Sequence, residues 1–217
     1  MSLSATQIHE AISRAKELGA ERKRKFTETL EISVGLRNID LKNPSNRFNF
    51  EVRLPHNLRE DVKVAVFADG DLATRAQNLG LAVISRDELE ALGKDPKAAK
   101  KLANNYDFFI AMAPFMPLVG RFLGKILGPR AKMPKPIPPT FRDLEDLVSN
   151  YKRTVVLRIK TQPVVSVPVG KVTSSEDELT ENASVIIQSL LGKLEKGSQQ
   201  IKKITFKTTM GPAVTAS

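Results

Sequence analysis

Residues 62–68 read VKVAVFA, a short apolar run that only Lys63 interrupts. Apolar and polar residues do not alternate in it, as they do in a strand with one face in water. The run is typical of a strand that helices cover on both faces, as in a parallel sheet. Two similar runs follow, LAVIS at 81–85 and YDFFIAMAP at 106–114, and a helix-like segment at 72–79 separates the first two. This alternation of strand and helix predicts an α/β unit with a parallel sheet.

The rest of this region continues the same pattern. Helices are expected at 86–93, 95–105 and 115–128, and a short one at 141–152. Between them lies GPRAKMPKPIPPT, residues 128–140, in which five of thirteen residues are proline. Proline fixes φ and lacks an N–H group, so we expect this segment to be an extended, semi-rigid loop.

The segments on either side of this region have a different character. FTETLEISVGL (26–36) places Phe26, Leu30, Ile32 and Val34 on one side, and RFNFEVRLP (47–55) alternates in the same way. Such alternation predicts antiparallel strands with one packed and one free face. Further strands are expected at 154–160 and 164–170, with IKKITFKTT (201–209) as the last. Amphipathic helices are expected over 1–19, where Gly19 suits the stop, and over 174–197.

The pattern changes near Asp61 and changes back near residue 153. The economical interpretation is a split α+β domain, residues 1–62 and 153–217, whose antiparallel sheet carries helices on one face. Residues 63–152 form an α/β domain inserted into it. Two short links would then join the domains, which is a natural arrangement for a hinge.

Composition favours a polyanionic partner. The 217-residue chain has a net charge of +10 and a pI of about 9.8. Nucleic acid ranks ahead of an acidic membrane surface, and a merely basic protein is the alternative. The positive charge is clustered at Arg22, Lys23, Arg24 and Lys25. The segment 114–140 is free of acids and contains Arg121, Lys125, Arg130, Lys132 and Lys135. The chain from Lys196 onward has four lysines and no acid. Lysine and arginine grouped in this way neutralise phosphates.

Several functional classes are poorly supplied with residues. The chain has no cysteine and only two histidines, His9 and His56, which disfavours thiolate or histidine metal sites and Ser-His-Asp chemistry. No apolar run approaches the ~20 residues of a membrane span. An enzyme alternative rests on Asp69 and Asp71, which follow a buried strand where carboxylates can hold Mg²⁺ for phosphoryl transfer. Asp-Gly-Asp is equally ordinary loop and helix-cap chemistry.

The end of the chain carries residues suited to RNA. Phe206 fits core packing better than RNA binding, whereas Met210 lies between two threonines and a glycine, where burial is less forced. Apolar and aromatic faces beside basic residues read single-stranded or bulged RNA. Threonine hydroxyls and the backbone at Gly211 can bond a ribose hydroxyl or a phosphate.

Three stretches, in order, give the chain a resemblance to a known family. KFTETLEISVGL (25–36), GKILGPRAKMPKP (124–136) and TTMGPAV (208–214) resemble motifs of the universal ribosomal protein L-one family, and VPVGKV (167–172) is a weaker fourth match. The resemblance implies a split RNA-binding domain with an inserted three-layer, Rossmann-like domain. It implies RNA contacts by residues of both outer segments: Lys25, Phe26, Thr29, Lys171, Thr209, Met210 and Gly211. The basic loop of the inserted domain would be a secondary site.

The resemblance also implies a function. The expected protein is non-enzymatic and cytoplasmic, ribosome-associated, monomeric when free, and without cofactor or metal. It would bind large-subunit rRNA at the mobile stalk near the tRNA exit site, with its own mRNA and exit-site tRNA as further partners. A free RNA-binding translational repressor is the alternative. One departure from the motif stands out: Ala131 and Lys132 replace the usual Gly-Leu, which strains the loop if Ala131 must adopt a positive φ.

Overall fold

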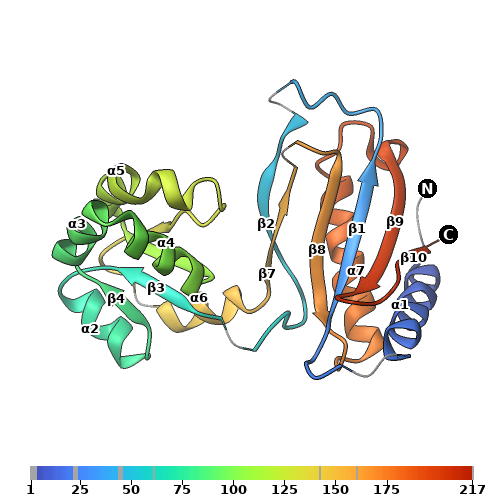
Figure 1. Cartoon of the computed structure of the whole chain (residues 1–217), viewed down its shortest axis with the longest axis horizontal. Coiled ribbons are helices and arrows are strands. Elements are labelled where there is room, and N and C mark those ends of the chain that lie inside the picture. Colours follow the sequence, from blue (N-terminus) through green and yellow to red (C-terminus); the bar gives the residue numbers. More distant parts are fainter. Residues whose placement is uncertain are drawn as a thin grey trace. The chain divides into compact units, whose positions relative to one another are not determined.

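A computed structural model describes residues 4–21, 24–43, 46–60, 62–141, 143–159 and 161–216. The chain forms two compact units (Figure 1). Unit 1 combines Met1–Glu60 with Arg153–Ser217, and unit 2 is the continuous stretch Asp61–Lys152.

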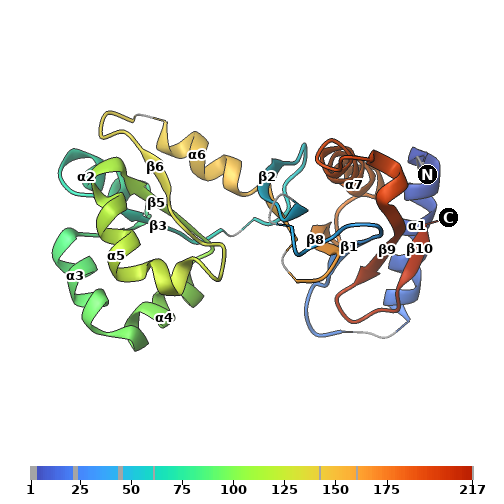
Figure 2. The same cartoon turned by 90° about the horizontal axis from the view of Figure 1, so that it is seen from above.

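Unit 1 is a four-stranded antiparallel sheet with two helices packed on it. The strands are β1 (Thr29–Leu36), β8 (Val164–Lys171), β9 (Ile201–Thr208) and β10 (Val214–Ala216), in the order β10-β9-β1-β8. Helices α1 (Ala5–Ala20) and α7 (Glu176–Leu191) lie side by side on one face (Figures 1 and 2). Strands β2 (Asn49–Arg53) and β7 (Thr154–Arg158) form a separate antiparallel pair.

Alternation in these strands explains the two layers. Ile32 and Val34 of β1 are buried, and so are Ile204 and Phe206 opposite them on β9. They pack with the apolar stripes of the two helices in a single core. The other face of the sheet is polar; there the hydroxyls of Ser33 and Ser166 lie 3.0 Å apart across β1 and β8. One packed and one polar face is the arrangement that the alternation predicts.

Unit 2 has a parallel sheet in the order β4-β3-β5-β6. Its strands are β3 (Val64–Phe67), β4 (Ala82–Ile84), β5 (Phe108–Met112) and β6 (Lys135–Ile137). Its helices are α2 (Asp71–Asn78), α3 (Arg86–Lys94), α4 (Pro96–Asn105), α5 (Met116–Leu127) and α6 (Leu144–Tyr151), and short 3-10 turns lie at Ala113–Phe115 here and at Gly197–Gln200 in unit 1.

The side chains of β3 point alternately into two cores, which makes unit 2 three-layered. Ala65 and Phe67 pack with α3, α4 and α5, whereas Val64 and Val66 pack with α2 and α6. All four side chains are buried, which is why the run 62–68 is apolar without alternating. The expected fold class, a split α+β unit with an inserted α/β unit, is therefore confirmed.

Several local predictions from the sequence were wrong. Helix α7 ends at Leu191, although the sequence predicted a helix to residue 197. The proline-rich segment is not only loop: β6 pairs in parallel with β5, which Pro136 permits because β6 is the last strand of its sheet. The strand at 201–209 is not the last, since the chain turns back through TTMGP into β10. Helix α1 continues past Gly19 to Ala20. Phe26 does not share the packed face of Leu30, because β1 begins only at Thr29 and Phe26 is 54% exposed.

None of the helices in the described part of the chain is long and apolar enough to cross a membrane.

Candidate nucleic-acid interface

The turn after β9 is joined to the start of β1, although 180 residues separate them in sequence. The Thr29 N–H donates to Thr209 Oγ1 (3.1 Å), and the Thr209 hydroxyl donates to the Thr29 carbonyl (3.3 Å). The Gly211 N–H donates to the Thr208 carbonyl (3.2 Å), which closes the turn. These bonds extend the β1–β9 pairing beyond Leu30 and Thr208, so the turn is held in place at this end of the sheet.

A buried carboxylate holds the same turn from beneath. Glu28 is only 8% exposed, and its Oε2 accepts the Met210 N–H (3.3 Å). Arg24 Nε lies 3.4 Å from Glu28 Oε1. The Thr208 hydroxyl, the Met210 N–H and Arg24 lower the pKa of the Glu28 carboxyl, and burial opposes them only in part. Glu28 was missed by sequence reasoning, although it lies within the KFTETLE stretch.

Two glycines allow the turn to approach helix α1. A Cβ on Gly19 would lie 2.6 Å from Thr208 Oγ1, and one on Gly211 would lie 3.2 Å from Gly19 Cα. The first contact is shorter than packed atoms tolerate and the second is tight, so a side chain at Gly19 would push Thr208 away from the helix and one at Gly211 would crowd the helix. Gly19 therefore has a packing role and is not the helix stop that its sequence position suggested.

The fixed turn presents an apolar side chain to solvent. Met210, at the tip of the turn, is 59% exposed, and Phe26 is exposed just before β1. Lys25 is exposed beside Phe26. Phe206, in contrast, is fully buried, as the sequence favoured. An apolar hollow of about 230 Å³ lies at Phe26 and is also lined by Arg24, Glu28, Thr173 and Thr208. Two exposed apolar groups, a hollow and cations are thus gathered at one end of the sheet.

Lys171 lies at the same end of the sheet. It is the last residue of β8 and is paired with Thr29 in the β1–β8 register. Its ammonium is 3.7 Å from Glu60 Oε2. The structure therefore brings six of the predicted RNA-binding residues to three adjacent strand ends or to the turn that follows β9: Thr29, Lys171, Thr209, Met210, Gly211 and, just ahead of β1, Phe26.

The predicted basic loop of unit 2 is divided by the structure. Arg121, Lys125, Arg130 and Lys135 are exposed on α5, in the turn after it and on β6. The Lys132 ammonium instead points inward and donates to the carbonyls of Ala103 (2.9 Å) and Tyr106 (2.7 Å) at the end of α4. A lysine in this position satisfies carbonyls that the helix leaves without partners. Lys132 therefore has a structural role in unit 2.

Ala131 has the strained conformation that its replacement of a motif glycine suggested. Its φ is +56°, in the left-handed region that favours glycine. Its N–H donates to the Gly128 carbonyl and the Lys132 N–H to the Leu127 carbonyl, both at 3.0 Å. These bonds close the end of α5 and impose the turn.

The acidic pair Asp69 and Asp71 and the first basic cluster, residues 22–25, add little to the candidate interface. Asp71 is paired with Arg75 (2.7 Å) in the first turn of α2, and Asp69 is exposed in the preceding loop. Within the described ranges, no three acidic or histidine side chains form a group that could hold a metal ion. Of the first basic cluster, Arg22 and Lys23 lie outside the described residues.

The fold and the groups at this end of the sheet define a two-unit protein. It has a split α+β unit with basic and apolar groups at one end of its sheet, and an inserted α/β unit. Residues 16–212 match the Ribosomal protein L1p/L10e family, and the chain belongs to it.

Similar proteins extend over nearly the full length. The chain is 50% identical over 214 residues to the large ribosomal subunit protein uL1 of Pyrococcus abyssi, covering 99% of this chain and 97% of that protein. It is 47% identical to the protein of the same name from Thermococcus kodakarensis, with 99% and 98% covered. The Methanothermobacter thermautotrophicus protein, also named uL1, is 49% identical over 209 residues, covering 96% and 97%.

Proposed function

We propose that this protein is a non-enzymatic component of the large ribosomal subunit that binds rRNA through one end of the unit 1 sheet. The observation that carries the proposal is the turn Thr208–Gly211, which Thr29 and Glu28 hold in place with Met210 exposed at its tip. Family membership and relatives named as large-subunit proteins support the ribosomal role. Such a protein would be cytoplasmic and ribosome-associated.

The side chains and backbone groups at this end of the sheet suit folded RNA. A rigid apolar tip makes a shape-dependent contact in a shallow minor groove or against an unstacked base, without needing a particular base edge. Thr209 and the Gly211 backbone can bond ribose hydroxyls beside it. Lys25, Arg24 and Lys171 supply positive charges that attract phosphates. The net charge of +10 adds a long-range attraction. Contacts of this kind recognise the shape of an RNA more than its sequence.

Finer features of the function remain part of the proposal. We place the bound rRNA at the mobile stalk near the exit site for tRNA, as the family motifs imply. The same surface would bind the protein's own mRNA wherever that mRNA presents the shape of the rRNA site, so that free protein represses its own synthesis. Exit-site tRNA is a further partner, and the exposed cations of unit 2 are the candidates to contact it. We expect the free protein to be a monomer.

Chemical footprinting of the full chain on purified large-subunit rRNA tests the proposal. One compact protected region, lost when Met210 and Phe26 are both replaced by alanine, is the expected result. Protection spread over the whole rRNA, or unchanged by the double substitution, would contradict specific binding at this edge. Cofractionation with large subunits separates the ribosomal role from that of a free repressor.

A further inference from the structure

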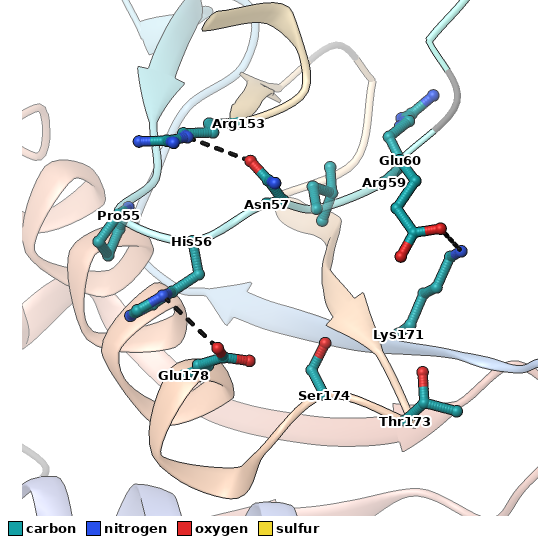
Figure 3. A pocket seen from close by; sticks show the side chains of 11 residues that line it. Pro55, His56, Asn57, Arg59, Glu60, Arg153, Lys171, Thr173, Ser174 and Glu178 are labelled. Atoms are coloured by element: carbon teal, nitrogen blue, oxygen red, sulfur yellow. Dashed lines mark hydrogen bonds and ion pairs between the residues drawn. The ribbon is translucent and has the colours of Figure 1, made fainter. Parts of the chain in front are cut away.

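A second hollow adjoins the candidate interface in unit 1 and is strongly polar. Its volume is about 380 Å³, and segment 55–60 forms one wall. The opposite wall is the end of β8 and the approach to α7, where Lys171, Thr173 and Ser174 lie (Figure 3). Thr173 also lines the hollow at Phe26, so the two hollows are neighbours. The pocket is therefore within reach of an RNA that is seated at this end of the sheet.

The first part of the wall 55–60 is firmly attached to α7. The His56 N–H donates to Asn182 Oδ1 (3.0 Å), and the Asn182 amide donates to the Val169 carbonyl (2.9 Å). Asn182 is only 1% exposed, so both bonds are shielded from water. The His56 ring adds a contact of 2.6 Å to Glu181. Arg153 Nε donates to Asn57 Oδ1 (3.1 Å) from the other side. The pocket is therefore preformed at this end.

The last residue of the wall is held much less firmly. The Glu60 carboxylate reaches across to the Lys171 ammonium (3.7 Å; Figure 3), and the Glu60 side chain is 81% exposed. An ion pair at this distance between side chains this accessible to water is weak. The other acidic residue of the pocket, Glu178, faces the His56 ring on the far side and not Lys171 (Figure 3). Glu60 thus occupies the place beside Lys171 where another anion would bind.

We propose that this pocket is a phosphate subsite for the bound RNA, and that a backbone phosphate displaces Glu60 from Lys171. A phosphate carries one negative charge, as the carboxylate does, and adds acceptors for the nearby hydroxyls of Thr173 and Ser174. Glu60 is then an internal competitor that lowers the affinity for RNA. This inference rests on the proposed function, since it assigns one phosphate of the same RNA.

Filter-binding measurements with purified large-subunit rRNA, in phosphate-free buffer, test the subsite. Glu60→Gln keeps the size of the side chain and removes its charge, and we expect it to bind rRNA about two- to fivefold more tightly, the range of an exposed ion pair. Lys171→Ala should bind more weakly. Combined with Lys171→Ala, Glu60→Gln should have no effect, because the cation for which it competes is gone.

Glu195→Gln is the matched control for a general charge effect. Glu195 is exposed and precedes β9, and so lies at the opposite end of the sheet from Thr29. Equal gains from Glu195→Gln and Glu60→Gln, no gain from Glu60→Gln, or a gain that persists without Lys171 would each overturn the subsite. Failure of the wild-type chain to prefer rRNA over a scrambled transcript would instead overturn the proposed function itself. Circular dichroism of each variant excludes unfolding as the cause.

Discussion

Met210 and Lys25 differ in the kind of contact that each offers to RNA. Met210 is an exposed apolar side chain on a turn that its backbone bond to Glu28 keeps in place, whereas Lys25 is an exposed charge ahead of the strand. The first can contribute only through close, shape-dependent contact. The second acts on any phosphate within reach, whatever the shape of the RNA.

Alanine substitution should separate the two kinds of contact. Met210→Ala is expected to cost about 1–3 kcal/mol of binding to rRNA, by analogy with truncation of base-stacking residues, and to leave the salt dependence unchanged. Lys25→Ala should weaken rRNA and scrambled RNA alike and lower the salt slope by roughly 0.7–1. Affinities at several salt concentrations measure both. Met133→Ala, an exposed methionine of unit 2, and Lys202→Ala, at the far end of the sheet, are matched controls. Wild-type affinity of Met210→Ala would make the turn purely structural.

Glu28 links the site to the stability of the fold. Since the pKa of its carboxyl is below the ordinary 4.5 in the folded protein, its charge contributes stability above that value. The contribution disappears as the pH falls through 4.5 and then through the lower folded pKa. Glu28→Gln, which keeps an acceptor for the Met210 N–H but loses the charge, should reduce the free energy of unfolding at pH 7 by about 1–3 kcal/mol.

Urea unfolding of the wild type and Glu28→Gln between neutral pH and about pH 3 measures this effect. The difference between them should be constant at neutral pH and shrink below pH 4.5. Glu10→Gln on the exposed face of α1 provides the control for loss of one carboxylate. A difference that stays constant down to the lowest pH would show that Glu28 does not titrate with a lowered pKa.

At the scale of elements, helices and strands that carry a hydrophobic period or an unbroken apolar run were predictable, whereas β10 and β6 were not. The apolar runs of β3 and β5 and the alternation of β1 can be recognised in the sequence alone. Strand β10 has three residues, too few to show a period, and β6 contains a proline that argues against a strand unless its place at the sheet edge is known.

The candidate site was predictable only in part, for a related reason. The residues that the site exposes belong to the family motifs, so the sequence analysis identified them. Glu28 and Gly19 act through contacts with Thr208 and Met210 that join distant parts of the chain. No local pattern reports that a glutamate near the start of a strand will be buried under a turn 180 residues later. The inward-pointing Lys132 was missed because only the tertiary fold brings it to the end of α4.

The turn after α5 offers a stability test at the same scale. Ala131 adopts φ +56°, a conformation that costs an L-residue with a Cβ roughly 1–2 kcal/mol. Glycine relieves this strain but adds about 0.4–1 kcal/mol of backbone entropy to the unfolded state. Ala131→Gly should therefore raise the free energy of unfolding by up to about 1.6 kcal/mol. Ala91→Gly, in helix α3, is the control and should be destabilised by about 1 kcal/mol. Equal destabilisation of both in chemical denaturation would contradict strain at Ala131.

At the scale of the whole molecule, the proposed RNA-binding residues with the strongest structural case all belong to unit 1, which has a core of its own. The two segments of unit 1 that lead to unit 2 are held together near their ends: Arg53 pairs with Thr154, and the Leu54 N–H donates to the Arg153 carbonyl (2.8 Å). Glu60, the last residue of the first segment, lines the same hollow as Arg153. A short connection can therefore replace unit 2 without distorting unit 1.

We expect unit 1 alone to keep the preference for rRNA. With residues 63–152 replaced by a short Gly-Ser linker, the protein should still bind rRNA more tightly than a scrambled transcript. The salt slope should fall, because the exposed cations of α5 and the turn after it are removed. Filter binding at several salt concentrations measures both, and circular dichroism verifies folding. The shortened chain with Met210→Ala is the control and should lose most of the preference. A folded shortened chain that binds both RNAs equally would mean that unit 2 supplies part of the recognition and that the site at the sheet edge is incomplete.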